Sequence, residues 1–121
     1  RDTLGMRLVG ESENFGTEQE HLNGVFGARV RITALRAKRG PGIELLEYLA
    51  PTTGRPAPTD SRVNDLWTWQ VRCNTPSLDT AEAVLRQVGA GWISPGIVES
   101  AAGRALMVRD PDGHALLLSN P

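Results

Sequence analysis

The sequence has one cysteine, no long hydrophobic run and almost no excess of either charge. A single thiol, Cys73, excludes an intramolecular disulfide and a zinc site built from several cysteines. No apolar run approaches the ~20 residues of a membrane-spanning helix. Thirteen Lys and Arg against fourteen Asp and Glu lack the basic excess typical of a nucleic-acid-binding surface. We therefore expect a cytoplasmic protein that binds neither nucleic acid nor membrane.

The composition is that of one folded domain. The 121 residues are 40% hydrophobic and 22% charged, which is typical of a globular chain and not of a disordered one. Residues 50–64 hold three of the eight prolines and have no periodicity. We interpret this segment as a linker, and residues 1–121 as a single domain with an N-terminal module at 1–49 and a C-terminal module at 65–121.

The second module has the clearer pattern of secondary structure. Residues 80–88 place apolar side chains at i, i+3, i+4 and i+7, which predicts an amphipathic helix that Gly89 ends. Around it, alternating or short apolar runs predict strands at residues 66–73, 92–98, 105–109 and 114–119. The expected order is therefore strand, helix, strand, strand, strand.

The first module has the same order without its first strand and most of its helix. Leu4 followed by Gly5 is typical of a helix C-terminus. Strands are expected at 6–13, 25–37 and 43–49, with a hairpin turn at 38–42 and a polar, turn-like connection at 14–23. A duplicated βαβββ module explains this order, and we expect the missing opening strand to belong to a longer polypeptide.

Three segments resemble signatures of the vicinal oxygen chelate superfamily, also called the glyoxalase/bleomycin resistance protein/dioxygenase family. They are RDTLGM at 1–6, which resembles the family's FYRDxLGM, GIEL at 42–45, and VRDPDGH at 108–114. The three occur in the family's order and span nearly the whole chain. The resemblance implies an α+β fold in which paired βαβββ modules form an incomplete barrel with a concave cup.

The resemblance also implies a divalent metal in that cup, held by His, Glu and sometimes Gln from four strands. Glu44 matches the glutamate ligand of the family, and its carboxylate suits Zn, Ni, Mn or Fe. The next ligand position falls on Thr68, or on Leu66 if the register is shifted, and the last falls on Leu117. Threonine and leucine are poor or impossible ligands, so the visible ligand set is depleted. One further ligand would belong to the missing strand.

Other side chains are candidates for lining the cup. Because side chains alternate along a strand, Glu44 and Glu47 lie on opposite faces and at most one enters the cup. We interpret His114 as a structural hydrogen-bonding residue of the turn, and the two tryptophans of the 66–73 strand as core. If Arg31 faces inward it favours an anionic ligand, and if outward it is a solvated charge. The candidates for contact with a small molecule are Arg31, Thr33, Thr68, Gln70, Arg72 and Leu117.

Two functions remain open. The first is binding of a small organic molecule in the cup, of the resistance or sequestration type, without a metal. The alternative is a divalent-metal-dependent lyase, isomerase or dioxygenase. A homodimer is expected, because a chain lacking its first strand exposes a sheet edge. The sequence contains no Gly-rich phosphate loop and no Ser/His/Asp set, so neither a nucleotide-binding nor a hydrolase function is supported.

Overall fold

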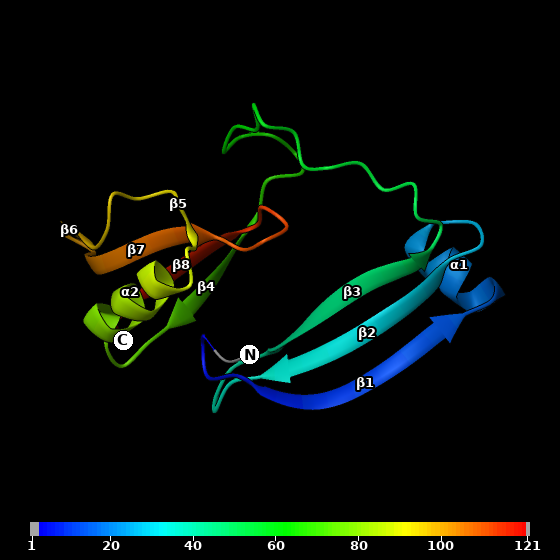
Figure 1. Ribbon diagram of the computed structural model, residues 1–121, viewed down its shortest axis with the longest axis horizontal. Coiled ribbons are helices and arrows are strands. Elements are labelled where there is room, and N and C mark those ends of the chain that lie inside the picture. Colours follow the sequence, from blue (N-terminus) through cyan, green and yellow to red (C-terminus); the bar gives the residue numbers. More distant parts are fainter. Residues whose placement is uncertain (1–2, 121) are drawn as a thin grey trace. The chain divides into compact units, whose positions relative to one another are not determined.

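The computed structural model describes residues 3–120, which form a mixed α+β protein with eight strands and two helices (Figure 1). The chain divides into two compact units, Arg1–Arg55 and Pro56–Pro121. The boundary between them falls inside the segment 50–64 expected to be a linker. Each unit has its own sheet, and each is described by itself below.

The first unit is an antiparallel sheet of three strands in the order β1-β2-β3. The strands are β1 (Arg7–Phe15), β2 (Arg29–Arg36) and β3 (Gly42–Ala50). They match the expected strands to within a few residues, because alternation of apolar and polar side chains is a strong signal for a strand with two different faces. Gly5 has a φ of 65°, as expected at a helix end. Residues 1 and 2 of that expected helix end lie outside the described residues.

A short helix, α1 (Thr17–Asn23), replaces the turn-like connection expected at 14–23, so that prediction was wrong. It begins after Gly16 without a side-chain cap and ends at Gly24 in the left-handed conformation. Gln19 is buried, and Asn23 Nδ2 donates a hydrogen bond to Tyr48 Oη on β3 at 2.6 Å. The helix is held by polar contacts, and its sequence therefore lacks the apolar stripe that predicts a helix.

The second unit has a mixed sheet in the order β4-β8-β7-β5, with β6 also paired to β7. Strand β4 (Gln70–Asn74) runs parallel to β8 (Ala115–Ser119), and β8 runs antiparallel to β7 (Gly103–Arg109). The strand expected at 92–98 is split into β5 (Gly91–Trp92) and β6 (Val98–Ser100). Between them, Pro95 and Gly96 interrupt the pairing, because proline has no N–H to donate to a sheet.

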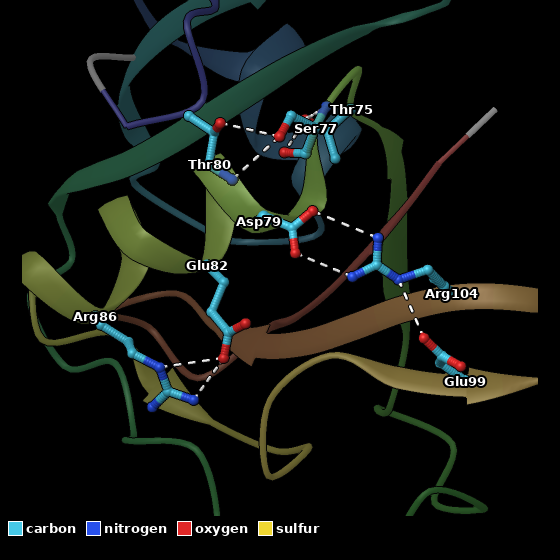
Figure 2. Close-up of polar contacts among 8 residues, drawn as sticks. All are labelled: Thr75, Ser77, Asp79, Thr80, Glu82, Arg86, Glu99 and Arg104. Carbon is cyan, nitrogen blue, oxygen red and sulfur yellow. Dashed lines mark hydrogen bonds and ion pairs between the residues drawn. The ribbon is translucent and has the colours of Figure 1, made fainter.

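Helix α2 (Leu78–Gln87) packs on one face of this second sheet, beside β7 (Figure 1). Its N-cap is Ser77, whose Oγ accepts a hydrogen bond from the Thr80 backbone N–H at 3.2 Å. Figure 2 shows this cap and the ion pair by which Asp79 of α2 contacts Arg104 of β7. The core beneath the helix consists of the buried side chains Leu78, Leu85, Leu106, Val108 and Leu118.

The strand expected at 66–73 starts four residues late, and the residues before it form turns. Thr68 Oγ1 donates to the Arg62 carbonyl at 2.7 Å, and its backbone N–H donates to the Asp65 carbonyl at 2.9 Å. Trp67 and Trp69 are 59% and 54% exposed, so the prediction that they are core was wrong. The apparent alternation ran across a turn, where it has no meaning for the side-chain direction.

No helix within residues 3–120 is long and apolar enough to cross a bilayer.

Candidate functional site

Glu44 lies at the exposed end of one face of the first sheet; at the other end of this face Val30 is buried and Tyr48 contacts Asn23 of α1. Its partner across the β2–β3 pairing is Ala34, which in turn pairs with Gly10 on β1. The remaining members of this face follow at every second residue along the three strands. We call this surface the Glu44 face; it consists of Gly10, Ser12, Asn14, Val30, Ile32, Ala34, Glu44, Leu46 and Tyr48. Glu44 is exposed and is the one charged side chain among these nine. It also lines an open depression of about 420 Å³ at the end of the β2–β3 hairpin.

The two other candidates of this unit lie on the opposite face of the same sheet. Arg31 pairs in register with Glu47, and Thr33 pairs with Leu45. Arg31 Nη1 forms an ion pair with Glu47 Oε2 at 2.7 Å, so its charge is already balanced. The structure therefore does not bring Arg31 and Thr33 together with Glu44. It does place Glu44 and Glu47 on opposite faces, as strand alternation requires.

The second sheet has an open face, on the side opposite α2. Arg72 on β4 pairs with Leu117 on β8, which pairs with Met107 on β7. The residues two positions before and after these on each strand point to the same side, so the face holds three residues from each strand. We call this surface the Arg72 face; it consists of Gln70, Arg72, Asn74, Ala105, Met107, Arg109, Ala115, Leu117 and Ser119. Three predicted lining residues, Gln70, Arg72 and Leu117, therefore share one face, whereas Thr68 lies in the turn before β4.

A buried serine holds the side chain of Arg72. Ser119 is 4% exposed, and its Oγ accepts a hydrogen bond from Arg72 Nε at 3.4 Å and donates one to Asn74 Oδ1 at 3.2 Å. Neither Nη atom of Arg72 has a hydrogen-bond acceptor in the part of the chain that the structure describes. Arg109 Nη1 donates to the Gly113 carbonyl at 2.7 Å. The Arg72 face thus carries two positive charges and no carboxylate.

The turn after β7 explains the position of His114. Its backbone N–H donates to Asp110 Oδ1 at 2.8 Å, and its Nδ1 lies 3.2 Å from Asp110 Oδ2. Gly113 has a φ of 91°, which a residue with a side chain rarely adopts. The His114 ring also lies 4.8 Å from the Trp69 ring, centroid to centroid. These contacts fit the structural role interpreted from the sequence.

Sequence reasoning missed the contributions of Ser119, Asn74 and Arg109. Alternation along 105–109 was enough to place Arg109 on the same side as Met107. The contact between Arg72 and Ser119, however, depends on the parallel pairing of β4 with β8. No local pattern in the sequence predicts that register.

No family model matches the sequence, and no curated protein matches it. Among solved structures, a glyoxalase family protein from Bacillus cereus superposes with a TM-score of 0.82 at 22% identity, covering 98% of this chain and 80% of that one. TioX from Micromonospora sp. gives a TM-score of 0.61 at 20% identity, covering 98% of this chain and 80% of that one. A superfamily member from Sphaerobacter thermophilus gives 0.54 at 18% identity, covering 99% and 81% respectively.

The chain has the fold of the glyoxalase/bleomycin resistance protein/dioxygenase superfamily. The α+β fold expected from the sequence is confirmed, and these structures agree with the resemblance that predicted it. At these identities the likeness is one of fold, and the same superfamily fold carries many different chemistries.

The divalent metal that this superfamily fold implies does not fit the donor groups present. Around Glu44, the neighbouring positions Ala34 and Gly10 offer no ligand atom. Leu117 is aliphatic, and the Thr68 hydroxyl is engaged with a backbone carbonyl. Residues 3–120 contain no group of three His, Cys, Asp or Glu placed to hold an ion, whereas a catalytic zinc normally has about three protein ligands.

Proposed function

We propose that this protein binds a small organic molecule against the exposed part of a sheet face without a metal ion, as a binding protein of the resistance or sequestration type. The observation that supports this function best is the side-chain set of the Arg72 face. Guanidinium, amide and hydroxyl groups lie there beside Leu117 and Met107. Five of the nine side chains are polar and four are apolar, so the face offers groups that orient an organic ligand next to an apolar contact surface.

The second candidate function is a divalent-metal-dependent lyase, isomerase or dioxygenase. Glu44 favours it, because this side chain keeps a carboxylate at the position that matches a superfamily ligand. It is exposed and forms no ion pair with any residue from 3 to 120. One carboxylate is too few for tight binding, so this function requires ligands besides Glu44.

Metal analysis of the purified protein distinguishes the two functions. After dialysis we expect well under one equivalent of Zn, Ni, Mn or Fe per chain. We also expect Glu44→Gln to leave the thermal midpoint unchanged, since no tightly bound ion is lost. Glu47→Gln, on the opposite face, is the matched control. A stoichiometric metal that disappears in Glu44→Gln but remains in Glu47→Gln would establish the metalloenzyme instead.

A homodimer in the cytoplasm is part of the same proposal. Strands β1 and β3 are the edges of the first sheet, and an edge strand presents unpaired N–H and C=O groups to a second chain. The single cysteine suits a reducing compartment. Light scattering at micromolar concentration tests the dimer, and a monomer mass would rule it out.

A further inference from the structure

The Arg72 face carries cations without carboxylates, unlike the surfaces around the ion-paired arginines of the described chain. Arg29, Arg31, Arg86 and Arg104 each form an ion pair with a carboxylate. Among the nine side chains of the Arg72 face, two are arginines and none is acidic. An arginine in such a position has donors to offer and no fixed acceptor for them.

The guanidinium group of Arg72 contacts a buried residue of the neighbouring strand β8. The 3.4 Å hydrogen bond from its Nε to the buried Ser119 Oγ restrains one edge of the planar group, and Ser119 itself donates to Asn74. The two Nη atoms remain as a pair of parallel donors, the arrangement that binds a carboxylate in a bidentate manner. Holding the side chain in advance lowers the entropy lost when a ligand binds.

The side chains next to Arg72 indicate that the uncharged part of the ligand is apolar. Leu117 and Met107 lie in the same row across the sheet, and both are partly exposed. They offer an apolar surface next to the cation. An organic acid with an apolar body satisfies both features, because its carboxylate and its hydrocarbon part meet different residues of one row.

We infer that the Arg72 face binds small organic acids, with the carboxylate on the Arg72 Nη atoms and the apolar body against Leu117 and Met107. This inference rests on the proposed function and names the chemical class of its ligand. Arg109, in the neighbouring row, adds a second positive charge to the same surface.

A titration with two probes of equal shape tests the charge requirement. Benzoate and benzamide are added separately to ¹⁵N-labelled protein while amide shifts are recorded. We expect benzoate to shift the amides of 70–74 and 115–119 in a saturable way, and benzamide to bind at least about tenfold more weakly, as the loss of a charge-assisted hydrogen bond predicts.

Two substitutions test the role of Arg72 itself. Arg72→Met should weaken benzoate binding about tenfold or more, to the level of benzamide. Arg72→Lys keeps the charge without the planar pair of donors and should retain part of the affinity. Arg86→Met is the control, since Arg86 is bonded to Glu82 on α2, and it should bind benzoate like the native protein. Amide spectra of the free variants establish that each is folded.

Each contrary result has its own meaning. If benzamide binds the Arg72 face as tightly as benzoate, or if Arg72→Met binds benzoate unchanged, the inference is wrong while the proposed function stands. Benzoate could instead shift amides near arginines elsewhere, by the same amount in the native protein and in Arg72→Met. That result would show binding to surface charge only and would overturn the inference. If neither probe shifts the Arg72 face or the Glu44 face, the inference is overturned and the proposed function loses its support with it.

Discussion

The Glu44 face and the Arg72 face, one on each sheet, carry opposite charge. The Glu44 face has one carboxylate and no cation, whereas the Arg72 face has two guanidinium groups and no carboxylate. Both faces consist of every second residue on three neighbouring strands. The difference shows that the residues at a few alternating strand positions decide the charge of such a face, although the strands themselves are arranged alike.

The two units also differ in how a helix is attached to the sheet. Helix α2 covers one face of its sheet with buried leucines and starts at a serine cap. Helix α1 has no side-chain cap and contacts its sheet through Asn23 and Tyr48. The second unit therefore has the clearer division between a packed face and an open face, and three predictions test this division.

The largest change in the free energy of unfolding is expected from a substitution on the packed face of β8, compared with one on its other face. Leu118 is 1% exposed beneath α2, and Leu117 is half-buried on the Arg72 face. Leu118→Ala should lower the free energy of unfolding by about 2–5 kcal/mol, because it leaves a cavity in the core. Leu117→Ala should cost only about 1 kcal/mol, since less apolar surface returns to water. Urea denaturation measures both, and equal losses would contradict the division of the sheet into two faces.

An intermediate effect is expected from the caps of the two helices. Ser77→Ala removes the oxygen that accepts the Thr80 N–H, and should cost about 1 kcal/mol of the free energy of unfolding. Thr17→Ala, at the first residue of α1, removes no cap and should change this free energy by less than about 0.5 kcal/mol. The same denaturation experiment measures both variants. A larger loss for Thr17→Ala would reverse the comparison between the helices.

The smallest effect is expected from the ion pair that joins α2 to β7. The hydrogen bond from Arg104, together with its charge, holds the pKa of the Asp79 carboxyl below its usual range. A carboxyl with a depressed pKa in the folded state stabilises the protein at neutral pH, and this contribution is lost as the pH falls from about 4, the ordinary Asp value, through the lowered pKa. Both groups are at the surface, so the contribution is small.

Thermal unfolding as a function of pH measures this contribution. Asp79→Asn should unfold at a slightly lower temperature than the native protein at pH 7, and the difference should shrink as both are acidified. Glu99→Gln is the control, because Glu99 Oε1 lies farther from the same arginine, at 3.5 Å. A difference that grows on acidification would mean that Asp79 is destabilised in the folded protein.

The strands of both units could be predicted because each has two unlike faces. The pattern failed where polar contacts decide the structure. Helix α1 has seven mostly polar residues and is held by the Asn23–Tyr48 hydrogen bond. Thr68 was assigned to a strand because Trp67 and Trp69 flank it, although its hydrogen bonds to Arg62 and Asp65 place it in a turn.

The candidate site was predictable only in part, for a related reason. Alternation separates Glu44 from Glu47 and groups Gln70 with Arg72 without any knowledge of the fold. Whether Arg31 is free or paired depends on the residue opposite it on β3, and the support of Arg72 depends on Ser119. Such partners come from other strands, and their register is set by packing rather than by local sequence.

The parallel pairing of β4 with β8 has a consequence for synthesis on the ribosome. Neighbouring strands of the first unit follow each other along the chain, so β1, β2 and β3 can pair in the order in which they are made. In the second unit β8 lies between β4 and β7, and Asn74 meets Ser119 across 45 positions of sequence. We therefore expect the newly made β4 and β7 to remain unpaired, and α2 without its complete sheet, until β8 has been synthesised. During that interval Leu106 and Val108 are exposed to chaperones.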